Sequence, residues 1–213
     1  MSYILSFRNR PKLPTHIPGL APPPPNLLGR FYNLDPSVNW SSFIPIPNGP
    51  IKYLEIGCAD GGNAIIISNS YCSHPDSKIY CVDPWFDYPD YPEYKGVQEE
   101  GWKNFNINIR NSGNFQKFVI RRGLSDDIVP TFENEFFDII FVDGNHETEY
   151  VYRDGVMSFQ KVKSGGYIVF DDYNIIWPQT MAGVNKFINE YSDRIRVLGT
   201  PTYVKSQLII QKL

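Results

Sequence analysis

From residue 51 onward, short apolar runs alternate with longer stretches in which apolar residues recur at helical spacing. The apolar runs predict strands at 52–56, 78–83, 117–121, 137–142 and 166–171. The longer stretches predict helices near 62–72, 97–111, 148–162 and 180–192. Strand–helix alternation of this kind predicts parallel βαβ units. Nearly continuous apolar runs such as DIIFV are typical of strands that are covered on both faces.

Two more strand-like segments, 194–198 and 207–211, lie near the end of the chain. The stretch between them is too short for a helical crossover, so we expect the two strands to pair antiparallel. The sequence therefore predicts an α/β fold: a Rossmann-like, doubly wound, mostly parallel seven-stranded sheet with a C-terminal antiparallel hairpin.

Residues 1–50 have a different pattern, because several prolines, including the run Pro22–Pro25, disfavour helix and favour extended backbone. We expect 1–50 to form a proline-rich N-terminal arm or strap, lying on the domain or covering its active-site mouth. A junction with a neighbouring domain is an alternative. Residues 51–213 are expected to form one folded domain.

Composition narrows the possible partners. The chain has 213 residues, 42% of them hydrophobic and 20% charged, which fits one globular domain. A net charge of −3 provides no basic field for nucleic acid, so we expect no nucleic-acid partner. No run approaches the roughly 20 apolar residues of a membrane span. Three cysteines without metal-binding spacing favour free thiols and a cytoplasmic protein. A homo-oligomer stays an open alternative.

A glycine-containing turn follows the first predicted strand and opens the first predicted helix. Gly57 and Gly61 allow tight turning and close approach of the backbone to a ligand. The helix start presents N–H groups and a positive dipole end. Asp83, at the end of the second strand, can accept the hydroxyls of a ribose. A turn that needs glycine only for its shape is the plainer alternative.

The spacing E-x-G-x-x-x-G, from Glu55 to Gly61, resembles motif I of the class I methyltransferases, which use S-adenosylmethionine (SAM). The terminal hairpin is similar to the last two strands of that family. The resemblance implies that Glu55 holds the turn and the methionine amino group, and that Asp83 binds ribose. It also implies cofactor contacts around the turn, from Gly57, Cys58, Ala59 and Gly61, and a contact of Ser125 with the adenine. Trp85 lies close to Asp83 in the sequence, so we expect it to flank the adenine or to take part in acceptor recognition.

Three aspartates follow two predicted strands: Asp143 ends FDIIFVD, and Asp171 and Asp172 end GYIVFDD. Carboxyl ends of neighbouring parallel strands meet at one edge of a sheet, where ligands bind. Clustered carboxylates repel one another unless a cation or proton intervenes, and oxygen ligands favour Mg²⁺, Mn²⁺ or Ca²⁺. We expect these three residues to hold a divalent metal, with helix or turn capping as the alternative.

FDIIFVDGNHETEYVYRD followed by GGYIVFDDY resembles the metal-dependent sugar O-methyltransferases with D-G-x-H and D-D motifs and, more distantly, catechol O-methyltransferase. The resemblance implies that His146 and Asp143 are catalytic and that His146 is the general base. A metal-ligand or structural role for His146 is the alternative. Thr148 departs from the sugar group, which usually carries an aromatic residue there.

The expected function is therefore SAM-dependent methylation of a hydroxyl on a sugar or glycan, for example a deoxyhexose such as rhamnose, assisted by a divalent metal. The aromatic and acidic segment 84–94 is the expected acceptor-recognition loop, or else a packed surface loop. A catechol or other phenol is an alternative acceptor, and a non-catalytic SAM-binding module is a further alternative. The glycine spacing disagrees with a nicotinamide oxidoreductase.

Overall fold

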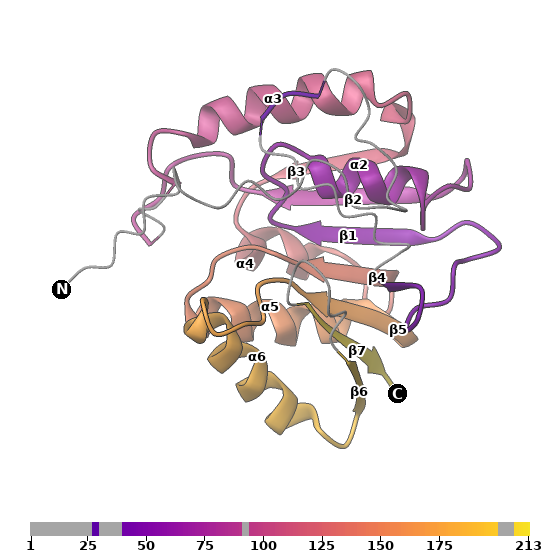
Figure 1. Cartoon of the computed structure of the whole chain (residues 1–213), viewed down its shortest axis with the longest axis vertical. Helices are drawn as coiled ribbons and strands as arrows, with labels where there is room; N and C mark the ends of the chain where they lie inside the picture. Colours follow the sequence, from indigo (N-terminus) through magenta and orange to yellow (C-terminus); the bar gives the residue numbers. More distant parts are fainter. Residues whose placement is uncertain (1–26, 30–39, 91–93, 200–206) are drawn as a thin grey trace.

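A computed structural model describes residues 27–29, 40–90, 94–199 and 207–213 of the chain. These residues form one seven-stranded sheet with helices on both faces (Figure 1). The strands are β1 (Lys52–Ile56), β2 (Lys78–Asp83), β3 (Phe118–Arg122), β4 (Phe137–Val142), β5 (Val162–Phe170), β6 (Ile195–Gly199) and β7 (Leu208–Lys212). The helices are α2 (Gly62–Asn69), α3 (Gln98–Asn111), α4 (Ser125–Ile128), α5 (Thr148–Lys161) and α6 (Pro178–Tyr191), with 3₁₀ turns η3 (Phe115–Lys117) and η4 (Val129–Thr131).

The strand order is β3-β2-β1-β4-β5-β7-β6. Strands β1 to β5 pair parallel, and β7 runs antiparallel to both β5 and β6. The predicted doubly wound sheet with its terminal hairpin is confirmed. Strand β1 lies at the centre of the sheet: β2 and β3 are added on one side of it, and β4 and the later strands on the other. This order opens a crevice at the carboxyl ends of β1 and β4, where ligands bind in sheets of this kind.

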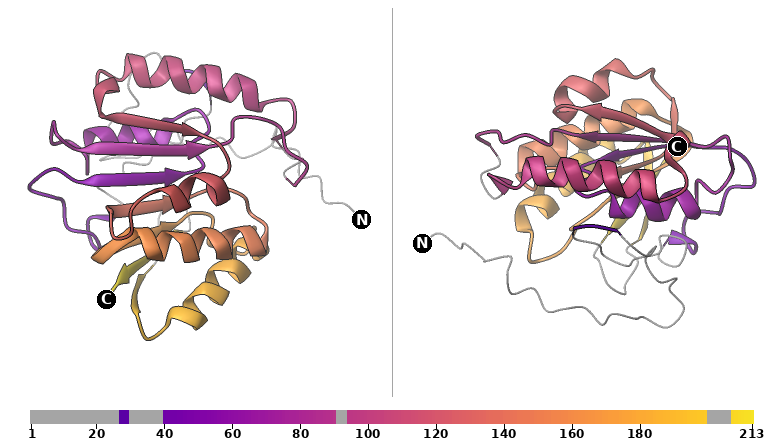
Figure 2. Two further views of the ribbon diagram at one scale, coloured as in Figure 1. Left: turned by 180° about the vertical axis from the view of Figure 1, so that it is seen from behind. Right: turned by 90° about the horizontal axis from the view of Figure 1, so that it is seen from above.

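Helices lie on both sides of the sheet (Figure 2, right), and two apolar clusters cover its two faces. Tyr53 and Ile139 pack with α2 and α3, whereas Leu54 and Ile140 pack with α5 and α6. Alternate residues of a strand point to opposite faces, which is why neighbours in the sequence belong to different clusters. Burying one such large side chain contributes about 1.5–3 kcal/mol. The rigid sheet thereby fixes the positions of the loops at its carboxyl edge.

The described residues that precede β1 pack on this core. Trp40 and Ile44 are each 1% exposed, and the hydroxyl of Tyr71 donates to the carbonyl of Ile44 over 2.9 Å. The backbone of Leu28 exchanges two hydrogen bonds with the side chain of Asn108, each of 2.7 Å. The run Pro22–Pro25 lies outside the described residues, and a boundary at residue 50 stays a prediction. Among the described residues, no helix has the length and apolarity to cross a membrane.

Two elements differ from the sequence-based expectation. Strand β5 begins at Val162, directly after α5, and its pairing with β4 changes register between Phe137 and Ile139. Gly165 has a φ of +78°, a conformation that glycine adopts without strain, so the strand continues through the irregularity. Helix α4 was not expected, because four residues are too few for a periodic apolar pattern to be recognised.

Candidate functional site

A cavity of about 300 Å³ opens at the carboxyl edge of the sheet. Its walls come from the turn after β1, the end of β2, the start of α4, the loop after β4 and the second residue after β5. Those walls include most of the residues expected from the sequence: Glu55, Gly57, Cys58, Ala59, Asp83, Ser125, Asp143, His146 and Asp172. This volume is in the usual range for a small-molecule site.

The turn after β1 needs glycine for two separate reasons. Gly57 has a φ of +83°, and a Cβ placed there would lie 2.0 Å from the carbonyl oxygen of Asp143. Gly61, at the N-cap position of α2, has a φ of +85°, and its Cβ would lie 2.9 Å from the ring of Phe105. Gly57 thus brings the turn against the loop that carries Asp143, and both loops border one cavity.

Asp83 ties this turn to the end of β2. Its Oδ2 accepts the N–H groups of Cys58 and Ala59 at 2.8 and 3.0 Å, and its Oδ1 accepts that of Trp85 at 2.8 Å. Burial raises the pKa of the Asp83 carboxyl, while the three N–H donors act in the opposite direction. The carboxyl lines the cavity and also holds the turn, and ribose binding by Asp83 stays a prediction.

Trp85 supports the same turn from behind. Its side chain is fully buried, with ring centroids 4.9 Å from Trp102 and 4.6 Å from Phe105. The indole N–H donates to the carbonyl of Ala59 over 2.8 Å. Trp85 supports the turn through Ala59, and Gly61 is the N-cap of α2, but neither is among the described residues that line the cavity. Their direct contact with a cofactor stays a prediction.

Glu55 provides a buried negative charge at one end of the cavity. The side chain is 1% exposed, and its Oε2 accepts the Tyr53 hydroxyl at 2.7 Å and the Asn63 amide at 2.8 Å. The pKa of Tyr53 is raised well above its usual value, first by burial and then by the nearby Glu55 charge, so its hydroxyl keeps its proton and serves as a donor. These two donors hold the Glu55 carboxyl in one orientation.

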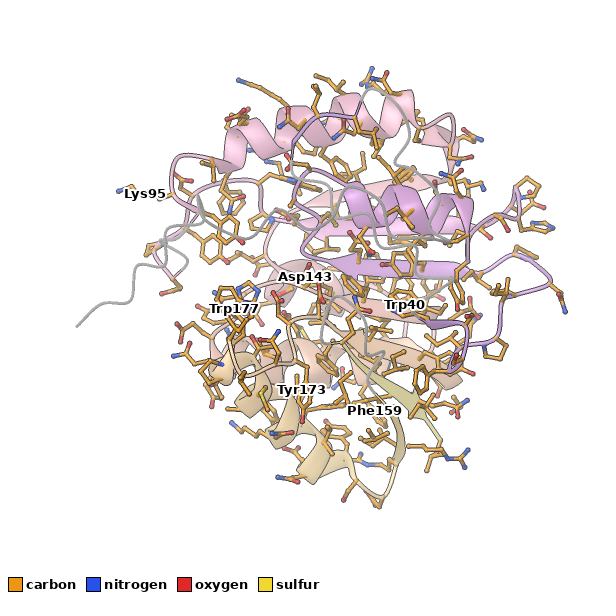
Figure 3. The ribbon with its side chains drawn as sticks, viewed as in Figure 1. Trp40, Lys95, Asp143, Phe159, Tyr173 and Trp177 are labelled. Carbon is orange, nitrogen blue, oxygen red and sulfur yellow. The ribbon has the colours of Figure 1, made fainter. Side chains whose placement is uncertain are left out.

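A second polar group lies at the ends of β4 and β5. Ligand atoms of Asp143, His146 and Asp172 all lie within 4.8 Å of one another. The His146 Nε2 is 3.1 Å from Asp172 Oδ2, and the His146 ring stacks on Trp177 with centroids 4.3 Å apart. Asp143 and Trp177 are labelled in Figure 3. The structure thus brings together Asp143, Asp172 and His146, as expected from the sequence.

Asp171 is placed differently from Asp172. It is 2% exposed, its N–H donates to the carbonyl of Val142 over 2.9 Å, and its side chain borders a second, smaller cavity beside Thr180. It is not part of the three-residue group found among the described residues. Its role as a metal ligand stays a prediction.

Asp154, on α5, is a cavity residue that sequence reasoning missed. It is 3% exposed and its carboxyl hydrogen-bonds the side chain of Ser125. Burial raises the pKa of Asp154 to about 7, against the lowering effect of the Ser125 hydrogen bond. An acid on the otherwise buried face of α5, between Val151 and Ser158, is the signal that could have found it.

The segment after β2 closes over the cavity, as far as it lies within the described residues; positions 91–93 lie outside them. Tyr88 and Asp90 line the cavity. The Tyr150 hydroxyl donates to Asp90 Oδ2 over 2.7 Å, and the Asn145 amide donates to the Asp90 carbonyl over 3.3 Å. Burial raises the pKa of Tyr88 to about 12, so its hydroxyl stays protonated. Asn145 therefore links this segment to the loop of Asp143 and His146.

Trp40 and Gln207 complete the wall near Glu55 and were also missed. The Trp40 Nε1–H donates to Gln207 Oε1 over 2.7 Å, across 167 residues of sequence. No local pattern marks either residue, because the pair forms only when the chain before β1 meets the start of β7.

Comparison with known proteins identifies the family. The model of a family described as a methyltransferase domain matches residues 54–173, which include the glycine turn, Asp83, Asp143 and Asp172. The chain belongs to this methyltransferase family. The prediction of a methyltransferase is confirmed at this level.

One relative and two solved structures are similar to this chain. An uncharacterised protein of Acanthamoeba polyphaga mimivirus is 27% identical over 168 residues, which cover 76% of this chain and 71% of the viral protein. The O-methyltransferase TomG of Streptomyces achromogenes, solved with SAM, aligns with a TM-score of 0.57 at 16% identity over 76% of this chain and 72% of its own. A Bacillus cereus O-methyltransferase with S-adenosylhomocysteine (SAH) gives 0.57 at 14% identity, over 76% and 73%. The structural likeness shows a shared methyltransferase fold.

Proposed function

We propose that this methyltransferase transfers the methyl group of SAM to a hydroxyl of a sugar or glycan, assisted by a divalent metal. One observation carries the proposal: the group Asp143, His146 and Asp172 borders the same cavity as the glycine turn. A methyl donor and a hydroxyl-activating group would thereby meet within one enclosure. The solved O-methyltransferases with SAM or SAH bound have the same fold, which supports this choice of cofactor.

The cavity fits the parts of SAM. The Gly57 turn lets the backbone approach a ligand closely, and the buried Glu55 carboxyl complements an ammonium group. Asp83 lies at the end of β2, where the hydroxyls of a ribose are bound in sheets of this kind. SAM supplies a methyl group that its sulfonium already activates, so the main work of the protein is alignment of the hydroxyl with the S–CH₃ bond.

The acidic group fits a divalent cation. Oxygen ligands around Mg²⁺ lie at about 2.0–2.1 Å from the ion, so opposite ligands are about 4 Å apart. The ligand atoms of Asp143, His146 and Asp172 lie within 4.8 Å of one another. Two neighbouring carboxylates repel unless a cation compensates them. Asp143 and Asp172 would hold the ion, with Asp171 as a further ligand, and the ion would lower the pKa of a bound hydroxyl.

His146 is the group that takes the proton. Its side chain is 15% exposed and is held by Asp172 and Trp177, which fixes the ring at the cavity wall. As the acceptor oxygen bonds to the methyl carbon, the S–CH₃ bond breaks, its electron pair stays on sulfur and SAH forms. The hydroxyl proton passes to the imidazole of His146.

The acceptor is inferred from the wall opposite the glycine turn. Tyr88 and Tyr150 offer aromatic faces to the apolar side of a sugar ring, and Asp90 and Asn145 offer hydrogen-bonding groups to its hydroxyls. A catechol is the second candidate, because the aromatic rings of Tyr88 and Tyr150 at the cavity wall can also contact a planar acceptor.

The test is transfer of labelled methyl from SAM to a panel of sugar glycosides and catechols, each with Mg²⁺ or with EDTA. We expect label on a sugar, and loss of the label with EDTA. Asp143→Ala should abolish the Mg²⁺-dependent transfer while SAH affinity stays within about twofold of the wild type. Transfer that survives EDTA would contradict the metal role, and label on catechols alone would contradict the sugar acceptor.

A further inference from the structure

The two ends of the cavity belong to opposite layers of the molecule. Trp40 and Cys58 are part of the apolar cluster that packs with α2 and α3, and Glu55 and Gln207 line the cavity beside them. The opposite end is formed by residues of α4 and α5: Ser125, Asp126, Arg153 and Asp154. The Gly57 turn lies at the sheet edge between these layers. A ligand with two chemically different ends would therefore meet two different walls.

Hydrogen bonding settles how the Gln207 amide is oriented. An indole N–H only donates, so the atom that faces Trp40 Nε1 at 2.7 Å must be the amide oxygen. The Trp40 ring is itself fixed, with centroids 5.6 Å from Tyr71 and 5.8 Å from Phe141, and it is 1% exposed. Since the oxygen is committed to Trp40, the group that Gln207 can offer to a ligand is its NH₂ donor.

The chemistry of this end is that of an amino-acid binding site. An α-amino acid carries an ammonium and a carboxylate on one carbon. Glu55 supplies the negative charge for the ammonium, and the carboxylate needs N–H donors. The Asn63 amide already donates to Glu55 and to the Tyr53 hydroxyl, so it is engaged in holding the Glu55 carboxyl and not in binding a ligand carboxylate. The Gln207 side-chain NH₂ provides such a donor, and Gln207 lines the cavity together with Glu55.

We propose that the Gln207 side-chain amide donates to the α-carboxylate of the methionyl part of SAM, with Trp40 as the positioning residue that orients the amide. The assignment rests on the proposed function, because it takes SAM as the ligand. It makes the chain before β1 and the start of β7 parts of the cofactor site, although each lies far from the glycine turn in sequence.

The experiment compares two ligands of the full-length protein by calorimetric titration. SAH carries the amino-acid end, whereas 5′-methylthioadenosine has the same adenosine and sulfur without it. Gln207→Glu keeps an acceptor for Trp40 but brings a negative charge to the carboxylate. We expect it to weaken SAH binding by about tenfold or more, the usual loss for a charge-assisted hydrogen bond, and to leave methylthioadenosine binding within about twofold.

Two further variants test the role of Trp40 and the specificity of the Gln207 effect. Trp40→Phe keeps a ring but removes the N–H, so we expect a smaller fall of the SAH-to-methylthioadenosine affinity ratio. Gln98→Glu makes the same substitution at another glutamine that lines the cavity, and we expect it to leave the ratio unchanged. Thermal unfolding of each variant shows whether the fold is kept.

An unchanged ratio in Gln207→Glu, or equal weakening of both ligands, would overturn the assignment. If Gln207→Glu does not fold, Gln207→Leu is measured in its place, with the same expected fall in the ratio. A wild-type chain that binds neither ligand overturns the proposed function itself, and the Gln207 assignment with it.

Discussion

His146 Nε2 lies 3.1 Å from Asp172 Oδ2, although the two residues are 26 positions apart in the chain. The contact joins the loop after β4 to the second residue after β5, and both side chains are less than one-fifth exposed. A histidine that is held by a carboxylate at the wall of a cofactor-sized cavity has the setting of a general base. The first prediction tests this role.

Replacement of His146 should separate chemistry from binding. We expect His146→Ala to lower the methyl-transfer rate by about 10²–10⁴-fold, the usual contribution of a general base, with SAH affinity within about twofold of the wild type. Steady-state rates and calorimetry measure the two effects. His74→Ala, on a loop with 37% of the side chain exposed, serves as the control. A His146→Ala enzyme with nearly normal turnover would assign the histidine a structural role.

Substitution of Gly57 should destroy the cofactor site. In Gly57→Ala the new Cβ would lie 2.0 Å from the Asp143 carbonyl oxygen at a φ of +83°, so the two loops must separate. We expect SAH binding to fall by more than tenfold, together with a loss of stability above the about 1–2 kcal/mol cost of a left-handed residue.

Gly113→Ala is the matched control for Gly57→Ala. Its φ is +78° and nothing lies within 4 Å of its Cβ position, so it carries the backbone strain without the clash. SAH titration and urea denaturation compare the two variants. Equal stability losses and unchanged SAH binding in both would show that the close approach of Gly57 to Asp143 has no functional consequence.

Burial of Asp154 should make stability depend on pH. Its pKa is raised from 3.8 to about 7, chiefly by desolvation, so the folded state favours the protonated acid. Relative to Asp154→Asn, the free energy of unfolding of the wild type should therefore fall as pH rises from about 4 through about 7. The change is at most about 4 kcal/mol. Urea denaturation at pH 5 and pH 8 measures it, and a difference that does not vary with pH would contradict the buried-acid interpretation.

The contact between Tyr150 and Asp90 should matter for the acceptor. Removing the hydroxyl in Tyr150→Phe breaks the 2.7 Å hydrogen bond that fastens the segment after β2 to α5. We expect KM for the acceptor to rise by about three- to tenfold, since one hydrogen bond contributes about 0.5–1.5 kcal/mol, with KM for SAM nearly unchanged.

The same helix offers a control for Tyr150→Phe. Tyr152 hydrogen-bonds Glu190 and does not line the cavity within the described residues, so Tyr152→Phe should leave both KM values unchanged. Equal effects of the two substitutions would mean that Tyr150 acts only through helix stability.

Local patterns predicted the sheet and the cofactor turn because both are encoded by neighbouring residues. The alternation of apolar runs gave β1 and β2 with the observed bounds, and the spacing of Glu55, Gly57 and Gly61 marked the turn that borders the cavity. The convergence of Asp143 and Asp172 also followed, since the carboxyl ends of adjacent parallel strands meet at one edge.

Other features depend on tertiary packing that no local pattern reveals. Asp171 and Asp172 are adjacent in sequence, yet Asp172 adopts a φ of +53° and borders the main cavity, whereas Asp171 borders the smaller one. Trp85 packs behind the turn because the Trp102 and Phe105 rings of α3 accommodate it there. The pairing of Trp40 with Gln207 requires the segment before β1 and the residue that precedes β7 to reach one wall.

Calorimetric titration of the purified protein with SAM and, separately, with NAD tests the central claim most directly. The Glu55-to-Gly61 spacing and the antiparallel β7 predict saturable SAM binding that Gly57→Ala abolishes, and no binding of NAD under the same conditions. Saturable binding of NAD, or no binding of SAM by the wild-type chain, would contradict the assignment of this cavity to a methyl donor.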